Sequence, residues 1–129
     1  MIKSIGTDFL EKSRIKKIFL KHGERLVERI LSNEESGEFN SKNSLEKKVS
    51  YLSNNFASKE AISKVLGTGF SNGVYMKDIQ VLRSAAGSPY ASLKGIASKV
   101  AKDKGIENFH LSITDTKYYS LAFAVGEQK

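Results

Sequence analysis

The C-terminal end of the chain carries the pattern that most restricts its fold. Phe109, Leu111 and Ile113 alternate with polar residues, and a second alternating run at residues 119–125 follows a short turn at residues 115–117. Alternation with a period of two is typical of β-strands, and two such runs joined by a short turn predict an antiparallel hairpin. We therefore expect the chain to end in a β-hairpin.

Helical spacing dominates the first half of the chain. Apolar residues recur at helical intervals in residues 11–31 and again in residues 45–66. Gly23 predicts a break in the first of these segments, and Gly67 predicts the end of the second. The intervening residues 32–44 are rich in Ser, Asn, Glu and Gly, and we interpret them as a loop.

The N-terminal residues 2–10 alternate like the C-terminal runs. Ile5 and Phe9 fall on one side of this segment, and Asp8 falls on the other with small polar residues. The pattern predicts a half-buried strand that carries Asp8 on its polar side. A carboxylate on a strand would be held rigidly.

The segment between the central helix and the hairpin gives shorter signals. Residues 74–77 and 79–82 are β-like, residues 87–89 predict a turn, and residues 93–104 predict a helix. Strands and helices are mixed without strict βαβ order. We therefore expect an α+β fold, with a mostly antiparallel sheet packed with helices, in one domain that spans residues 1–129.

The composition excludes several kinds of chemistry. The 129 residues include no cysteine, so disulfides, thiolate nucleophiles and cysteine-ligated metals are absent, and any metal must bind to oxygen or histidine. A carboxylate precedes any apolar segment at the N-terminus, and no stretch approaches the roughly 18 apolar residues of a membrane span. These features predict a cytoplasmic protein with no membrane partner.

The positive charge is concentrated early in the chain. The formal net charge is +7, and residues 12–29 alone hold seven basic residues against two glutamates, a local charge of +5. Such a surface attracts an anionic partner. A solvated helix face and a nucleic-acid-binding module are the alternatives, although a nucleic-acid module would interleave aromatic residues, and here Phe19 alone is aromatic and has the spacing of a core residue.

Acidic side chains are the candidates for a metal site. Mg²⁺ typically takes one or two protein carboxylates and completes its shell with water and substrate phosphates. Asp8 and Glu60 would serve if the fold brings them together, and Lys64, one turn after Glu60, could reach a phosphate. In the alternative interpretation Asp8 caps a turn and Glu60 pairs with Lys64.

Four blocks of sequence occur in a fixed order along the chain. The blocks are Gly6-Thr7-Asp8 followed by Arg14, Phe56-Ala57-Ser58-Lys59-Glu60-Ala61-Ile62-Ser63-Lys64 with Gly67-Thr68-Gly69, Gly87-Ser88-Pro89-Tyr90, and His110-Leu111-Ser112-Ile113-Thr114. Together they resemble one family, the small 4′-phosphopantetheinyl transferases of the bacterial holo-[acyl-carrier-protein] synthase type, and the resemblance runs from residue 2 to about residue 126.

The resemblance implies a magnesium-dependent enzyme. Such enzymes transfer the phosphopantetheine arm of coenzyme A to a serine of apo-acyl carrier protein and release adenosine 3′,5′-bisphosphate. Asp8 and Glu60 match the magnesium ligands of the family, and Lys64 matches the lysine beside the coenzyme A phosphates. His110 matches a position beside the nucleotide, and the other residues placed at the coenzyme A site are Gly67, Gly69, Pro89 and Ser112.

The resemblance also implies an assembly and a protein partner. The family forms homotrimers that bind coenzyme A in clefts between subunits. Acyl carrier proteins are acidic, so the basic segment would steer them. The basic residues that we expect to bind the carrier protein are Arg14, Lys17, Lys21 and Arg25.

Two positions depart from the family pattern. Asn55 stands where many relatives have a phosphate-contacting arginine, so this contact is absent or is supplied elsewhere. The acid that some relatives place near the metal as a proton acceptor falls on Gly37. Glu35 and Glu38 are the nearby candidates for the base, and a metal-bound water is the alternative.

Overall fold

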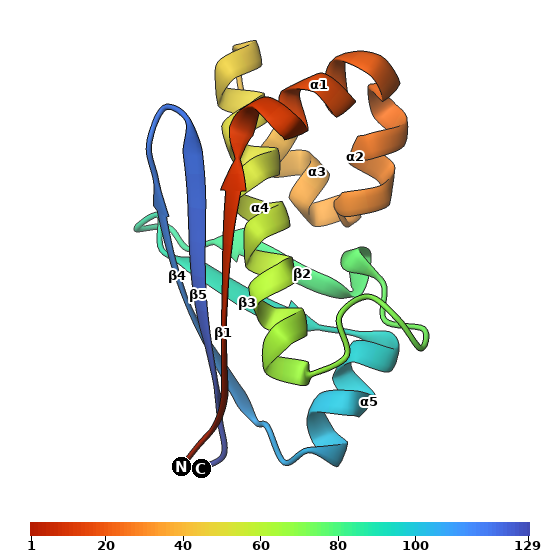
Figure 1. Cartoon of the computed structure of the whole chain (residues 1–129), viewed down its shortest axis with the longest axis vertical. Coiled ribbons are helices and arrows are strands. Elements are labelled where there is room, and N and C mark those ends of the chain that lie inside the picture. Colours follow the sequence, from red (N-terminus) through yellow and green to blue (C-terminus); the bar gives the residue numbers. More distant parts are fainter.

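A three-stranded antiparallel sheet joins the two ends of the chain. In this computed structural model, which describes residues 1–129, strand β5 (Tyr119–Glu127) lies between β1 (Ile2–Glu11) and β4 (Asn108–Asp115). The N- and C-termini lie side by side at one end of this sheet (Figure 1). The predicted C-terminal hairpin is confirmed, because β4 and β5 pair antiparallel around a turn between Asp115 and Tyr119.

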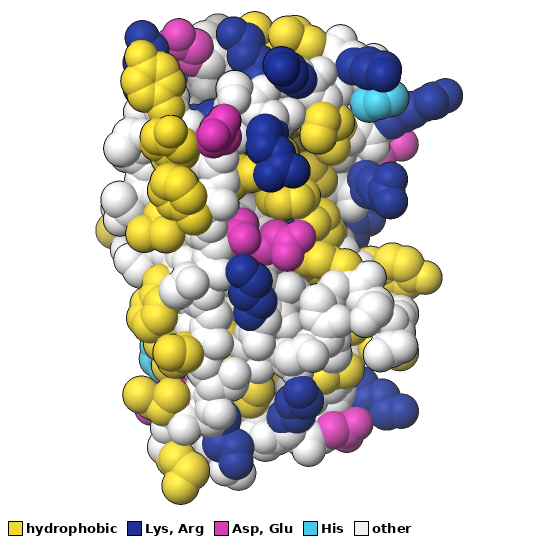
Figure 2. Space-filling model, viewed as in Figure 1, with side chains coloured by type: hydrophobic (Ala, Val, Ile, Leu, Met, Phe, Trp, Pro, Cys, Tyr) yellow, Lys and Arg dark blue, Asp and Glu magenta, His cyan; other side chains and the backbone are white.

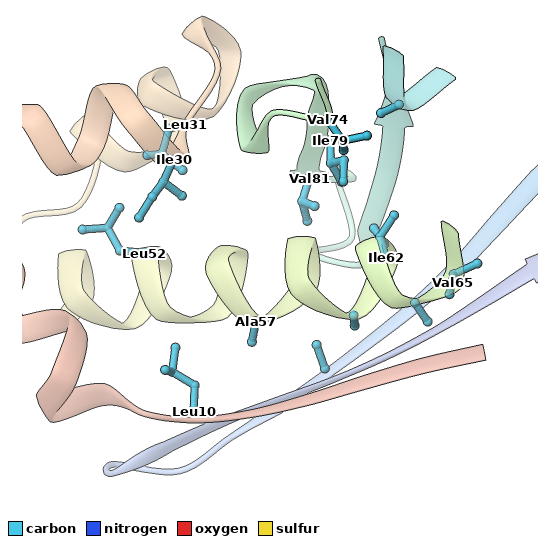
Figure 3. Packing of buried hydrophobic residues seen from close by; sticks show 14 of the residues in the cluster. Leu10, Ile30, Leu31, Leu52, Ala57, Ile62, Val65, Val74, Ile79 and Val81 are labelled. Carbon is cyan, nitrogen blue, oxygen red and sulfur yellow. The ribbon is translucent and has the colours of Figure 1, made fainter. Parts of the chain in front are cut away.

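Helix α4 (Leu45–Leu66) is the centre of the molecule. Ser44 caps its N-terminus by accepting a hydrogen bond from the backbone N–H of Lys47, and Gly67 ends it with φ of 79°, a left-handed conformation that glycine adopts without steric cost. One side of α4 packs against the three-stranded sheet, and the other side packs against the segment that includes strand β2 (Ile79–Arg83) (Figure 3). Leu52, Ala57 and Ile62 are completely buried between these layers.

The remaining elements close the two ends of the molecule. Helices α1 (Lys12–His22), α2 (Glu24–Ile30) and α3 (Asn33–Asn40) lie at one end, and helix α5 (Gly95–Asp103) lies at the other (Figure 1). Strand β2 pairs with β3 (Pro89–Leu93) in a separate two-stranded sheet. The predicted α+β class with antiparallel sheets is therefore confirmed, as is the helix break at Gly23.

Three local predictions were wrong. Residues 33–40 form α3 rather than a loop, because Ser32 and Glu35 make a reciprocal capping box that outweighs the loop-like composition. Residues 76–78 form a short 3₁₀ helix, η1 (Met76–Asp78), rather than a strand. Pro89, which was predicted to lie in a turn, instead begins strand β3. It occupies the first position of an edge strand, where a missing N–H is tolerated.

The alternation of β1 is confirmed, but its two faces are exchanged relative to the sequence interpretation. The face that carries Asp8 is the inner one, since Gly6 and Leu10 on the same face are buried against α4. Ile5 and Phe9 point outward and are 58% and 64% exposed. The exposed apolar face continues onto β5 with Tyr119, Leu121 and Phe123, and we call this set the outer sheet face. No helix in the structure combines the length and apolar character needed to cross a bilayer.

Candidate functional site

A glycine brings strand β1 against helix α4 and thereby sets the site. A Cβ added to Gly6 would lie 2.1 Å from the carbonyl oxygen of Ala61 and 3.0 Å from Cβ of Lys64. No other residue fits at this spacing, so the strand and the helix touch backbone to backbone. Asp8, two residues further along the same face of β1, is therefore held beside the turn of α4 that carries Glu60 and Lys64.

Lys64 links the two elements through its ammonium group. Its Nζ atom lies 3.5 Å from Oδ1 of Asp8 and donates a 2.7 Å hydrogen bond to the backbone carbonyl of Thr7. The Lys64 side chain is 53% exposed, whereas that of Asp8 is 19% exposed. The structure does not pair Lys64 with Glu60, because its hydrogen-bond partner, Thr7, and its ion-pair partner, Asp8, both lie on β1.

The surroundings of Asp8 and Glu60 disfavour the ionised form of both carboxyl groups. Burial raises the pKa of Asp8 above its ordinary value, and the nearby charges of Lys64 and Arg14 only partly offset this effect. Burial also raises the pKa of Glu60, and the negative charge of Asp8 raises it further. The site therefore holds two neighbouring acids and a lysine whose charge only partly offsets the effect of their burial. A further cation would stabilise the ionised carboxylates.

This donor set fits Mg²⁺. Two carboxylates from different elements match the one or two protein ligands that the ion uses, and the remaining positions suit water and phosphate oxygens. The structure contains no third acid or histidine close enough to complete a site made of protein ligands alone. An ion bound by Asp8 and Glu60 would therefore keep several positions for a phosphate-bearing substrate.

We call Asp8, Glu60 and the neighbouring Lys64 the acid cluster. His110 and Ser112 do not lie with it. They pair with Val125 and Phe123 of β5, and so they belong to the outer face of the sheet, whereas Asp8 pairs with Ala122 on the inner face. His110 is exposed, and its Nε2 atom lies 2.9 Å from Oε1 of Glu127. One chain thus places its candidate nucleotide residue and its acid cluster on opposite faces of one sheet.

The residues predicted at the coenzyme A site include two glycines, which lie in a loop, and a proline, which lies at the start of strand β3. Gly67 and Gly69 both have positive φ, and they lie in the loop that leaves α4 directly after the turn carrying Lys64. Pro89 begins β3 and pairs with Arg83 of β2. Gly67 and Gly69 are thus near Lys64 in sequence, and Pro89 lies on the other side of α4.

The candidate bases Glu35 and Glu38 lie on α3 and have other partners. Glu35 is completely buried and accepts hydrogen bonds from Lys59 Nζ at 2.8 Å and Asn55 Nδ2 at 2.8 Å. Glu38 accepts hydrogen bonds from the hydroxyl of Tyr51 and the backbone N–H of Arg83. Both glutamates lie on a helix rather than in the predicted loop, and these hydrogen bonds fix both carboxylates within the fold.

The basic residues of the first two helices form an exposed surface. Arg14, Lys17, Lys21 and Arg25 are all exposed, and Ile18 and Leu20 between them are 41% and 63% exposed. Figure 2 shows Lys and Arg side chains over this end of the molecule, with acidic side chains gathered near the middle of the same face. Arg14 lies close enough to Asp8 for its charge to lower the pKa of that carboxyl, so the basic surface reaches the acid cluster, with exposed apolar side chains among its charges.

Sequence reasoning missed Arg83, which the structure joins to Asn55. The Nη2 atom of Arg83 donates a 2.8 Å hydrogen bond to Oδ1 of Asn55. The only signal in the sequence was a charged residue at the end of the apolar run of residues 79–82. That signal could not reveal a contact between residues 28 positions apart in sequence.

The chain is similar to known proteins over its whole length. Residues 4–123 match the family described as the 4′-phosphopantetheinyl transferase superfamily. A holo-[acyl-carrier-protein] synthase from Vibrio parahaemolyticus is 40% identical over 126 residues, which cover 98% of each chain. The crystal structure of the synthase from Neisseria meningitidis superimposes with a TM-score of 0.89 at 36% identity, covering 99% of this chain and all of that one. The Bacillus anthracis synthase, crystallised in complex with CoA (3′,5′-ADP), gives 0.83 at 29% identity over 100% of this chain and 99% of that one.

Proposed function

Because this chain belongs to the 4′-phosphopantetheinyl transferase superfamily, as a holo-[acyl-carrier-protein] synthase, we propose that it transfers phosphopantetheine from coenzyme A to a serine of apo-acyl carrier protein. The observation that carries the proposal is the cluster of Asp8, Glu60 and Lys64, which gathers two acids and a cation beside an open surface. Phosphoryl transfer needs mainly positioning and charge neutralisation, and this cluster provides both.

The reaction breaks one phosphorus–oxygen bond and forms another. The serine hydroxyl oxygen attacks the phosphorus atom that bears the pantetheine arm, and the bond from this phosphorus to the bridging pyrophosphate oxygen breaks. Adenosine 3′,5′-bisphosphate leaves with the electron pair, and the serine proton passes to a base or to water. Lys64 neutralises charge on the pyrophosphate through its ammonium group, which a substrate can reach because the side chain is half exposed.

Magnesium is the metal that we propose for Asp8 and Glu60. Bound there, it would supply positive charge at the phosphate oxygens and relieve the repulsion between the two carboxylates. The pKa values of both acids are raised by burial, yet both must be ionised to bind the ion. Lys64 offsets only part of the energetic cost of ionising them, and a bound ion would offset more of it.

We propose that the acidic carrier protein docks on the basic surface of α1 and α2. Arg14, Lys17, Lys21 and Arg25 offer the positive charge, and Ile18 and Leu20 offer apolar contacts among them. Charge complementarity of this kind mainly raises the association rate. The position of this surface next to the acid cluster would bring the carrier serine toward the transferred phosphate.

A second copy of the chain would complete the site. If His110 and Ser112 bind the nucleotide of the same coenzyme A whose pyrophosphate lies at Asp8 and Lys64, one chain cannot supply both, because these residues lie on opposite faces of the sheet. The outer sheet face also exposes Phe9, Leu121 and Phe123, which a partner would cover. Both features support a homo-oligomer, and we propose the homotrimer that the family resemblance implies.

The proton acceptor is not assigned to Glu35 or Glu38. Each of the four carboxylate oxygens already accepts a hydrogen bond from a protein donor. This occupancy favours water near the acid cluster as the proton acceptor.

Calorimetry and product analysis test the proposed function together. Coenzyme A added with Mg²⁺ should release heat on binding, and a short RNA at the same concentration should not. Addition of apo-acyl carrier protein should then release adenosine 3′,5′-bisphosphate. Heat with the RNA alone, or binding of coenzyme A without release of the bisphosphate, would contradict the proposal.

A further inference from the structure

A buried lysine on α4 has three partners that the proposed reaction does not use. Lys59 and Glu35 are both completely buried, and the Nζ atom of Lys59 lies 2.8 Å from Oε1 of Glu35. The same ammonium group donates hydrogen bonds to the backbone carbonyls of Met76, at 2.8 Å, and Ile79, at 2.7 Å. An ammonium group has three donors, and here all three are used inside the fold. Lys59 therefore has no donor free for a substrate.

The two carbonyls that Lys59 binds lie where a loop ends. Residues 67–75 connect α4 to η1, and we call them the α4–η1 loop. Met76 begins η1 and Ile79 directly follows it, so the ammonium group binds the chain at both ends of this short helix. Because η1 also contacts α2 and α5, Lys59 fixes the end of the loop between these two helices.

The beginning of the α4–η1 loop is held by the next turn of α4. The backbone carbonyl of Ser63 accepts hydrogen bonds from the N–H groups of Gly67, at 2.9 Å, and Gly69, at 3.4 Å. Lys59 and Ser63 are four residues apart, so they lie on the same face of the helix. Residues 71–73, in the middle of the loop, are exposed. One face of α4 therefore anchors both ends of the loop.

Stability alone does not require a buried ion pair at this place. Apolar residues of similar volume in place of such a pair often leave the free energy of unfolding unchanged or raise it. Apolar residues could not, however, supply donors for the carbonyls of Met76 and Ile79. The pair of Lys59 and Glu35 is thus better suited to fixing a segment than to stabilising the fold.

We propose that Lys59, held by Glu35, is a positioning residue that keeps the α4–η1 loop in the conformation that binds coenzyme A. The proposal rests on the proposed function, because the loop leaves α4 directly after the turn carrying Lys64 and contains the two glycines that match the coenzyme A site. A loop that is fixed in the free protein need not be ordered when the substrate binds. Release of one end would lower the fraction of molecules in the binding conformation and raise Kd by the inverse of that fraction.

The test uses the E35Q/K59M variant, which removes the ammonium donors and leaves no unpaired charge buried. In the ligand-free variant, the amides of Val74 and Asp78, which hydrogen-bond to carbonyls of the loop, should exchange at least about 10-fold faster than in the wild type. The amide of Gly67, at the other anchor, should keep its exchange rate. Kd and KM for coenzyme A should rise about 5- to 20-fold, and kcat should stay within about twofold.

Two single variants separate this role from a loss of stability. E35Q lowers stability but leaves the ammonium group of Lys59 on both carbonyls, so its KM for coenzyme A should stay within about twofold of the wild-type value. K99M removes an exposed lysine of α5 and should behave as wild type in every measurement. Should E35Q/K59M not fold, E35M/K59M provides a second neutral pair with the same expected results.

Wild-type exchange at Val74 and Asp78 in the neutral-pair variant, or an unchanged Kd for coenzyme A, would overturn the proposal. An equal rise in KM in E35Q would also overturn it, because the lost stability rather than the lost donors would then be the cause. Failure of the proposed function is distinguishable, since the exchange experiment contains no coenzyme A. A wild-type enzyme without transfer activity would refute that function, and the exchange rates would still decide whether Lys59 holds the loop.

Discussion

The Nζ atom of Lys64 lies 3.5 Å from Oδ1 of Asp8 and hydrogen-bonds the carbonyl of the residue before it, so one side chain joins helix α4 to strand β1 at the centre of the acid cluster. A pair this exposed on the lysine side contributes little to stability. It places a cation beside a carboxylate, where the proposed function needs one to meet a substrate phosphate.

Neutral replacements of the two acids should stabilise the metal-free protein at neutral pH. Because burial raises the pKa of Asp8 and Glu60 in the folded state, their favourable contribution is present below the unfolded pKa and is lost as pH rises through the folded pKa. Asp8→Asn and Glu60→Gln should therefore raise Tm by a few degrees at pH 7. The difference should vanish below the ordinary pKa of each group, 4.5 for Glu60 and 3.8 for Asp8.

Thermal unfolding across this pH range, with and without Mg²⁺, provides the measurement. Added Mg²⁺ should raise the Tm of the wild-type protein toward that of the variants and leave the variants unchanged. A difference in Tm that stays constant with pH would show that charge is not its cause.

Gly6→Ala should separate β1 from α4 and lower both stability and activity. The new Cβ would lie 2.1 Å from a backbone oxygen that no rotamer change can move, so the cost in unfolding free energy should be about 1–3 kcal/mol. The separation would also move Asp8 away from Glu60. Denaturant unfolding and the transfer rate measure the two effects.

Gly37→Ala is the matched control for this change. A Cβ added to Gly37 would meet no atom within 4 Å, so alanine should be tolerated there and should favour helix α3 slightly. Equal behaviour of the two variants would contradict the role of close approach at Gly6.

Glu35→Gln should destabilise the fold without changing the chemistry. It leaves Lys59 buried without an anionic partner, at a cost of about 3–5 kcal/mol in unfolding free energy, while kcat per folded molecule stays near wild type. Glu34→Gln, at the exposed neighbouring position, should change neither the unfolding free energy nor kcat. A roughly 10²-fold fall in kcat at unchanged stability would instead identify Glu35 as the base.

Charge reversal on the basic surface should affect one substrate selectively. Arg14→Glu and Arg25→Glu should raise KM for carrier protein at least about 10-fold and change KM for coenzyme A much less, since both side chains are exposed. Higher salt should slow wild-type association. Lys99→Glu serves as the control, and equal effects on both substrates would argue against docking here.

An aspartate on the outer sheet face should dissociate the oligomer. Leu121→Asp or Phe123→Asp places a charge in the surface that we expect a second copy to cover. Light scattering should give about 43 kDa for the wild type, three times 14.3 kDa, and the monomer mass for the variants. Tyr75→Asp, 68% exposed away from this face, should leave the mass unchanged, and a monomeric wild type would contradict the assembly.

The elements defined by local periodicity could be predicted from the sequence. Helix α4, the C-terminal hairpin, the break at Gly23 and the end at Gly67 all depend on spacing within a few residues. Helix α3 could not, because its loop-like composition hides a capping box and the buried Phe39. Local composition does not show which segments a chain buries.

The site was predictable only in part, for the same reason. Asp8, Glu60 and Lys64 were named from motifs, and the structure brings them together. The alternation of β1 could not show which face meets α4, since Asp8 lies inward only because Gly6 allows the contact with Ala61. The link between Asn55 and Arg83 is likewise a long-range contact.

The intact mass of apo-acyl carrier protein, measured after incubation with coenzyme A, Mg²⁺ and the enzyme, tests the central claim most directly. The carrier protein should gain the mass of one phosphopantetheine group on its serine. The Asp8→Asn variant, which keeps the size of the side chain and removes its charge, should reduce the initial rate of this gain about 10²-fold or more. An unmodified carrier protein with wild-type enzyme, or an undiminished rate with Asp8→Asn at limiting Mg²⁺, would contradict the account.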